Sequence, residues 1–130
     1  MAMSMLIDSN ILIYAGDPRH RFLREFIKVN VPVVSIVSYI EVMGYDQLTD
    51  EQRQYFDEFF AITPPILINQ RIAEKAVTLR QQRKMSLGDA IIAATALVEN
   101  HTLVTRNTDD FKWIAELKLL NPFAKQPDDT

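Results

Sequence analysis

The chain has 130 residues, and its 48% of hydrophobic and 24% of charged residues are ordinary for one soluble globular domain. It has no cysteine, which excludes a disulfide framework, thiolate metal ligands and a cysteine nucleophile. The net charge of −3 argues against nucleic-acid binding by an overall excess of basic residues, so a polyanionic substrate would need a local basic patch, a metal ion or both.

Short apolar runs alternate with amphipathic stretches along the chain. Strands are predicted for the apolar runs at 5–7, 31–34, 66–68, 102–105 and 117–120. Helices are predicted at 18–28, at 36–45, from Thr49 or Asp50 to the prolines at 64–65, from Asn69 onward, and at 87–98 after Ser86. This alternation predicts an α/β fold, a small open parallel sheet of about five strands flanked by helices.

The chain shows no sign of a membrane segment or of a second domain. No apolar run approaches the ~18–20 residues that span a bilayer, and the N-terminus lacks the pattern of a secretory signal. We therefore expect a cytoplasmic protein. No linker or repeat divides the sequence, so we expect one domain over residues 1–130, with a flexible extension at 1–4 and a flexible polar tail at 125–130.

Two acidic residues lie where a parallel sheet would place a binding site. Ligands bind at the carboxyl ends of the strands in such sheets. Asp8 ends the first strand, and it fits equally well the N-cap of a short helix starting at Ser9 or a carboxylate that faces a cleft. Glu41 interrupts the apolar stretch 36–43, where a carboxylate is seldom buried without a partner, although the helix can also present it to solvent.

Further acids follow in the second half of the chain. Asp89 follows Ser86 at the spacing of a capping box, and this role is compatible with that of a ligand. The run Asn107, Asp109 and Asp110 is by itself typical of a turn. With two histidines and no cysteine, an oxygen-ligated Mg²⁺ or Mn²⁺ site is the metal site that the composition allows.

Taken together, these segments resemble the PIN-domain family, in particular the VapC- and FitB-type toxins of prokaryotic toxin–antitoxin pairs. The segments that carry the resemblance are 6–10, 38–42, 87–96, 103–111 and 120–123. The resemblance implies a PIN-like three-layer α/β/α fold and an endoribonuclease that hydrolyses RNA phosphodiester bonds with Mg²⁺ or Mn²⁺. It also implies a homodimer and a cognate antitoxin protein as partner.

The resemblance assigns catalytic and metal-binding roles to Asp8, Glu41 and Asp89. We expect Asp8 and Asp89 to carry the metal, and Glu41 to orient or deprotonate a water. Many relatives have an acid directly after the Thr-Arg pair, where this chain has Asn107. Asp110 is therefore assigned the role of the fourth acid, and Asn107 that of a neutral metal ligand or water holder.

Substrate and partner contacts are expected elsewhere on the chain. Asn10 and Arg106 are the candidates for RNA binding, with Arg106 positioning a phosphate. The candidate surface for the antitoxin or for the second copy of a dimer is the aromatic stripe Tyr55, Phe56, Phe59 and Phe60.

Three alternatives remain open at this point. Asn107 in place of an acid would suit an inactive PIN-like domain that binds RNA or protein without cleaving it. A receiver-like signalling domain would need paired acids near its first strand and a lysine after its last. The chain has the single Asp8 there and no lysine after Asn107 until Lys112. The acids by themselves do not distinguish a ribonuclease from a nuclease that cleaves DNA.

Overall fold

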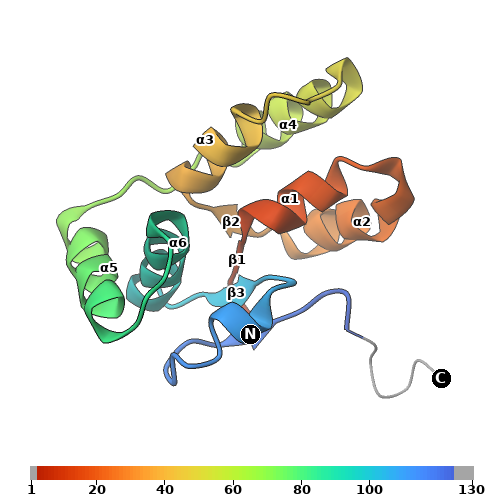
Figure 1. Ribbon diagram of the computed structural model, residues 1–130. Helices are drawn as coiled ribbons and strands as arrows, with labels where there is room; N and C mark the ends of the chain where they lie inside the picture. Colours follow the sequence, from red (N-terminus) through yellow and green to blue (C-terminus); the bar gives the residue numbers. More distant parts are fainter. Residues whose placement is uncertain (1–2, 125–130) are drawn as a thin grey trace.

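A parallel sheet with the strand order β2-β1-β3-β4 lies at the centre of the computed structural model, which describes residues 3–124 (Figure 1). Its strands are β1 (Met5–Ile7), β2 (Val33–Val34), β3 (Thr102–Val104) and β4 (Leu119–Leu120). Leu6 on β1 pairs with Val33 on one side and with Leu103 on the other. Every residue of β1 and β3 is buried, as expected for strands covered on both faces.

The predicted strand at 66–68 does not form. Ile66 makes only an isolated parallel bridge with Ser35 at the edge of the sheet. The two prolines at 64–65 have no N–H to donate to a ladder, and Leu67 is 70% exposed, so nothing buries the rest of this segment. The sheet therefore has four strands within residues 3–124 rather than about five.

The terminal segments for which flexibility was predicted are mostly outside the described residues. Residues 1–2 and 125–130 lie outside them. Within the predicted extension at 1–4, the carbonyl of Ser4 accepts a 2.9 Å hydrogen bond from the N–H of Thr102. This contact continues the pairing of β1 with β3 by one residue.

Helices cover both faces of the sheet, and most begin where the sequence predicts. The α-helices are α1 (Ser9–Ala15), α2 (Arg21–Asn30), α3 (Ile36–Met43), α4 (Asp50–Ile62), α5 (Gln70–Gln82) and α6 (Leu87–Val98). Two short 3₁₀ helices are η1 (Pro18–His20) and η2 (Thr108–Asp110), so the helix predicted at 18–28 begins as η1 and becomes α2 at Arg21. Thr49, Asn69 and Ser86 are side-chain N-caps, as predicted. In the part of the chain that the structure describes, no helix has both the length and the apolar character needed to span a bilayer.

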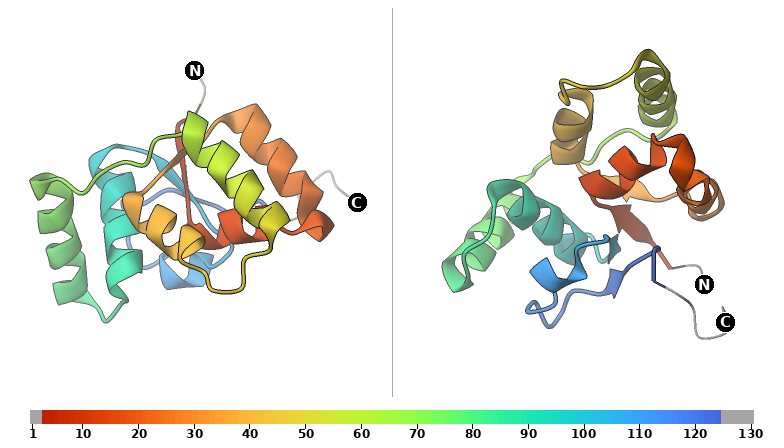
Figure 2. Two further views of the ribbon diagram at one scale, coloured as in Figure 1. Left: turned by 90° about the horizontal axis from the view of Figure 1, so that it is seen from above. Right: turned by 45° about the vertical axis from the view of Figure 1, so that its right-hand side comes forward.

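The core has two halves, one on each face of the sheet (Figure 2). Leu6 and Leu103 point to the half that α5 and α6 cover, whereas Ile7 and Val104 point to the half covered by α1, α2 and α4. This alternation follows from the two-residue period of a strand. The resulting α/β/α arrangement confirms the predicted three-layer fold, and it leaves the carboxyl ends of β1 and β3 side by side.

Candidate active site

Asp8 lies at the carboxyl end of β1 and is both a helix cap and a buried acid. Its N–H donates to the carbonyl of Val104 at 2.9 Å, which extends the β1–β3 pairing. Its Oδ1 accepts the N–H of Ser9 at 2.8 Å and so caps α1, while its Oδ2 accepts the hydroxyl of Thr105 at 2.8 Å. The residue is 5% exposed. Capping and a place in a site are therefore compatible for this carboxylate.

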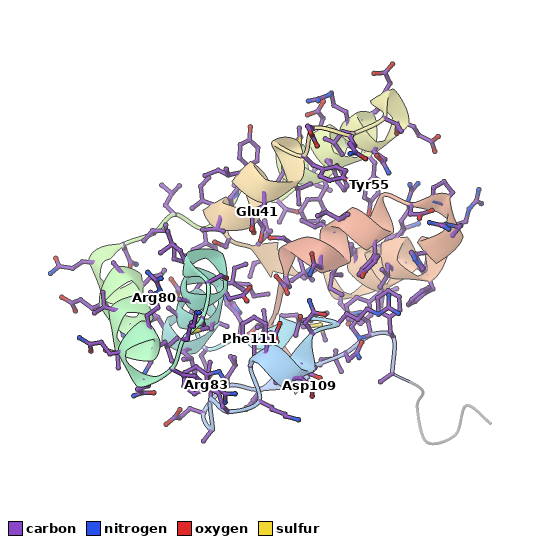
Figure 3. The ribbon with its side chains drawn as sticks, viewed as in Figure 1. Glu41, Tyr55, Arg80, Arg83, Asp109 and Phe111 are labelled. Atoms are coloured by element: carbon purple, nitrogen blue, oxygen red, sulfur yellow. The ribbon has the colours of Figure 1, made fainter. Side chains whose placement is uncertain are left out.

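Glu41 is held against α1 by a pair of serines. The hydroxyl of Ser9 donates to Glu41 Oε1 at 2.6 Å, and the hydroxyl of the fully buried Ser38 lies 2.8 Å from Ser9 Oγ. A Cβ atom at Gly88 would lie 3.4 Å from Glu41 Oε2, so the carboxylate also contacts the first turn of α6. The residue is solvent-exposed but projects from α3 toward α1 and α6 (Figure 3).

Asp89 stands in the first turn of α6, where its N–H donates to Ser86 Oγ at 3.1 Å. Asp110 ends η2 and is exposed. Electrostatic repulsion links these side chains: the charges of Asp110 and Glu41 both act on Asp89, and those of Asp89 and Glu41 both act on Asp8. The structure thus brings together the four predicted acids, and we call Asp8, Glu41, Asp89 and Asp110 the acidic cluster.

The environment of the cluster disfavours negative charge. Burial raises the pKa of Asp8 from 3.8 to about 6, against the opposing hydrogen bonds from Thr105 and Ser9, and the charges of Asp89 and Glu41 raise it further. Burial likewise raises the pKa of Asp89. The ion pairs among residues 3–124 are Arg19–Asp17 and Lys112–Asp109, so no basic side chain neutralises the cluster there.

A hard divalent cation suits these ligands by chemistry. Within residues 3–124, no three acidic or histidine side chains stand close enough together to hold an ion jointly. Mg²⁺, however, is commonly bound through one or two carboxylates and keeps several waters. Asp8 and Asp89 offer such a pair, and a cation between them would relieve the repulsion by which the charge of Asp89 raises the pKa of Asp8.

The segment after β3 carries the remaining candidates. The N–H of Asn107 donates to Thr105 Oγ1 at 3.1 Å, and its side chain forms no hydrogen bond among the described residues. Asp109 is paired with Lys112 at 2.9 Å and is not part of the cluster. Arg106 is exposed, with its guanidinium stacked on two aromatic rings. Asn10 is half-buried in the first turn of α1, two residues after Asp8.

The hydroxyl groups of Ser9, Ser38 and Thr105 orient the acids, and the sequence interpretation gave them no role. All three residues are buried, and a buried hydroxyl needs a hydrogen-bond partner. Thr105 had a usable signal, because it follows a buried strand in the same way as Asp8 does. Ser9 and Ser38 had a weaker one, since each stands within a few residues of a candidate acid.

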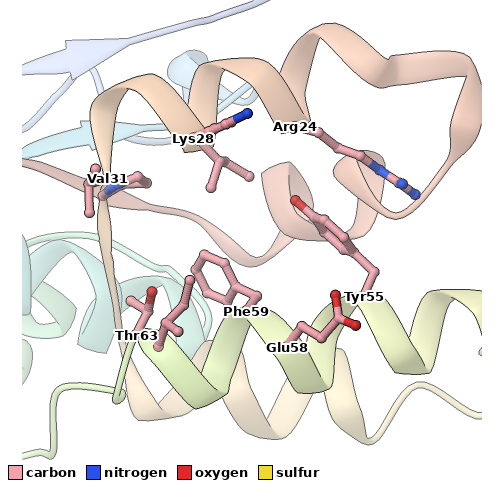
Figure 4. A pocket seen from close by; sticks show the side chains of 10 residues that line it. Arg24, Lys28, Val31, Tyr55, Glu58, Phe59 and Thr63 are labelled. Carbon is pink, nitrogen blue, oxygen red and sulfur yellow. The ribbon is translucent and has the colours of Figure 1, made fainter.

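The aromatic stripe on α4 is divided between the core and the surface, which corrects its interpretation as a contact surface of four rings. Phe56 and Phe59 are 1% and 6% exposed, because they pack on α1 and α2 in one half of the core. Phe59 also lines, together with Tyr55, one side of a cavity of about 380 Å³ between α2 and α4 (Figure 4). Arg24 and Lys28 line the facing side.

Comparison with known proteins identifies the protein family whose sequences and structures this chain resembles. The PIN domain family matches residues 5–117. Ribonuclease VapC of Rickettsia bellii (strain RML369-C) is 29% identical over 129 residues, which cover 91% of this chain and 96% of that protein. A toxin–antitoxin complex from Klebsiella pneumoniae contains a chain that is 35% identical, with a TM-score of 0.74 over 94% of this chain and 100% of that one. VapBC2 from Rickettsia felis, bound to a DNA fragment from its promoter, has the same fold at 22% identity, with a TM-score of 0.79 over 92% of this chain and 98% of that one.

Proposed function

This chain belongs to the PIN domain family, and from that premise we propose that it is a metal-dependent endoribonuclease, the toxin of a toxin–antitoxin pair. One observation carries the proposal. Near the carboxyl ends of β1 and β3, the charges of neighbouring acids act on Asp8 and Asp89, whose burial also disfavours their ionised forms. No basic side chain forms an ion pair with these acids among residues 3–124. Such clusters are typical of sites that bind a cation for chemistry.

Each acid has a role in this proposal. Asp8 and Asp89 hold Mg²⁺ or Mn²⁺. When bound, the ion neutralises phosphate charge and lowers the pKa of a coordinated water. Asp8 is oriented for this by Thr105 and Ser9. Asp110 adds negative charge beside Asp89, and Asn107 offers a neutral amide oxygen to the same site.

Glu41 accepts the proton of the attacking water. Its Oε1 accepts the hydroxyl of Ser9, and Oε2 accepts no hydrogen bond within residues 3–124, so we assign that proton to Oε2. A positioned general base of this kind commonly contributes a factor of about 10² to 10⁴ to the rate. The phosphodiester is held by this site, and Arg106 binds the RNA strand beside it.

We also propose partners for the chain. The similar structure from Klebsiella pneumoniae is a toxin–antitoxin complex, which supports a cognate antitoxin. The cavity between α2 and α4 is largely apolar, with Arg24 and Lys28 at its edge, and it suits an apolar peptide segment flanked by acids. For a homodimer, the exposed apolar side chains Tyr39 and Ile40 on α3 are the candidate contact. We place the activity in the cytoplasm, where RNA substrates are abundant.

The test is cleavage of a labelled pool of structured RNA by the purified protein in Mn²⁺, in Mg²⁺ and in EDTA. Asp89→Asn is run beside it, with Asp57→Asn on the exposed face of α4 as the matched control. We expect cleavage that needs the metal, survives in the control and is lost in Asp89→Asn.

Two other outcomes point elsewhere. Calorimetric Mn²⁺ binding without cleavage of any RNA would indicate a toxin that is inhibited or highly selective for its substrate. Absence of both cleavage and metal binding would replace the proposal by the inactive PIN-like domain, the alternative that Asn107 suggested. A DNA pool treated in parallel distinguishes the two classes of nuclease.

A further inference from the structure

Arg106 lies on a cluster of four aromatic rings next to the active site. The cluster, which we call the aromatic platform, consists of Tyr14, His20, Phe22 and Phe123. Contacting rings meet edge to face with centroids 5.1 to 6.1 Å apart. The guanidinium carbon of Arg106 is 4.2 Å from the centroid of Phe123 and 5.1 Å from that of Tyr14, so two rings hold its position.

The N–H groups of Arg106 have no partner within residues 3–124, in contrast to those of Arg24. Arg24 also stacks on a ring, at 4.4 Å from the centroid of Tyr55, but it donates to the carbonyls of Ala15 and Gly16. Arg106 forms neither such hydrogen bonds nor an ion pair with the described residues. Stacking engages only the face of a guanidinium, so its fork of N–H donors stays available to an anion.

The backbone fixes Arg106 beside the acidic cluster. The preceding residue, Thr105, is fully buried and donates its hydroxyl to Asp8 Oδ2. The same hydroxyl accepts the N–H of Asn107, so the residues on both sides of Arg106 are anchored. A phosphate bound by Arg106 would therefore be a near neighbour of one held at Asp8.

The platform also presents an open aromatic surface. Phe22, in the first turn of α2, is 47% exposed, whereas the other three rings are half-buried. Exposed aromatic rings beside a phosphate-binding cation are the combination with which proteins bind unpaired nucleotides, since every base can stack on a ring.

We propose, on the basis of the proposed ribonuclease function, that Arg106 and the aromatic platform bind the nucleotide next to the cleaved phosphodiester. The guanidinium forms charge-assisted hydrogen bonds to the phosphate of that nucleotide, and Phe22 stacks against its base. The occupant is single-stranded RNA, because a base within a duplex is not free to stack on a side chain. This subsite selects unpaired RNA segments as substrates.

The phosphate contact is tested by binding in an Asp89→Asn background, which separates affinity from cleavage. The affinity for a short fluorescein-labelled oligouridine is measured by anisotropy over a range of salt concentrations. We expect Arg106→Gln to lower the slope of log K against log salt by about 0.7, the share of one phosphate on a single strand. The matched control, Arg53→Gln on the exposed surface of α4, is expected to leave the slope unchanged.

The base contact is tested with variants of Phe22 on two ligands. One is the oligouridine, and the other is the same RNA backbone without bases. Phe22→Ala should weaken oligouridine binding about tenfold, whereas Phe22→Tyr should restore it. On the RNA without bases, Phe22→Ala should have no effect. Equal weakening on both ligands would show that Phe22 acts only through folding, and thermal unfolding of each variant checks this independently.

Failure of this inference and failure of the proposed function give different results. If the wild-type chain cleaves RNA and Arg106→Gln keeps both affinity and salt slope, the subsite is wrong and the ribonuclease remains. If the wild-type chain neither cleaves nor binds RNA, both proposals are wrong.

Discussion

Asp8 and Asp17 both cap the N-terminus of a helix, but their pKa values are shifted in opposite directions. Each is an aspartate that N-caps a short helix, since Asp8 accepts the N–H of Ser9 and Asp17 accepts the N–H of Arg19. The pKa of Asp17 is lowered to about 2 by hydrogen bonds from Arg19. The pKa of Asp8 is raised to about 6 by burial and by the neighbouring acids. Both residues are caps, so the difference comes from a neighbouring cation in the local sequence at Asp17 and from tertiary burial at Asp8.

The difference shows which of the two carboxylates destabilises the folded protein when it is ionised. Asp17 is only half-buried and has a cation beside it. Asp8 is buried, and the described residues place acids rather than a cation around it. Sites of catalysis commonly keep such unfavourable charge because the substrate or metal compensates for it.

The largest expected effect is on activity. Asp8→Asn should lower the rate of RNA cleavage by a factor of about 10² or more, because it removes a charged metal ligand. Asp17→Asn, the matched control, should cleave at the wild-type rate. Rates are measured on the same RNA pool in Mn²⁺. Equal rates for wild type and Asp8→Asn would remove Asp8 from the active site.

The next effect is on stability as a function of pH, in EDTA. Between the unfolded pKa of 3.8 and the folded pKa of about 6, the folded chain binds more protons at Asp8 than the unfolded chain does. The free energy of unfolding therefore falls as pH rises through this window, by about 3 kcal/mol in total. Urea unfolding across the window should show a larger fall in the wild type than in Asp8→Asn, where only the contribution of Asp89 is left. An identical pH dependence in both proteins would contradict the raised pKa.

A smaller effect is expected at Thr105. Thr105→Val keeps the shape of the side chain but removes the hydrogen bond to Asp8 Oδ2, leaving a buried carboxylate oxygen without this donor. We expect a loss of about 1–2 kcal/mol in the free energy of unfolding at neutral pH and a further rise in the pKa of Asp8. Thr105→Ser, which keeps the hydroxyl, is the control. Denaturant unfolding and the pH–rate profile of cleavage check both effects.

The smallest effect is expected at Asp17. Asp17→Asn removes the partner of Arg19, but the pair lies at the surface, with Arg19 exposed and Asp17 half-buried, and surface ion pairs contribute little. Asparagine also remains a good N-cap. The midpoint of thermal unfolding at neutral pH should stay unchanged. A large drop would show that the exposed pair matters more than its surroundings indicate.

Much of the fold and of the site could be predicted from short stretches of sequence. Asn69 and Ser86 cap helices through contacts three residues away, so their roles depend on little beyond the local chain. Strands β1 and β3 could also be predicted from their apolar runs, because a parallel strand that is buried on both faces has no polar face. Asp8 and Asp89 were found through their places at the ends of these elements.

Other features depended on contacts between distant parts of the chain. The bond from Thr105 to Asp8 spans 97 residues, and that from Ser9 to Glu41 spans 32. Neither hydrogen bond can be inferred from the sequence around the residues that form it. The burial of Phe56 and the absence of a strand at 66–68 also depend on tertiary contacts, because each is decided by what packs against that part of the chain.

The amino-acid sequence by itself thus determined where helices begin, which runs are buried and which acids end the strands. These properties follow from hydrogen bonds and hydrophobic periodicity within a few residues. Only the tertiary structure decided that the four acids lie near enough for their charges to act on one another, and that Thr105 and Ser9 orient two of them. It also decided that the guanidinium of Arg106 stacks on rings and keeps its N–H donors available. Charge repulsion, burial and stacking act through space, so their effects are set when the segments pack together.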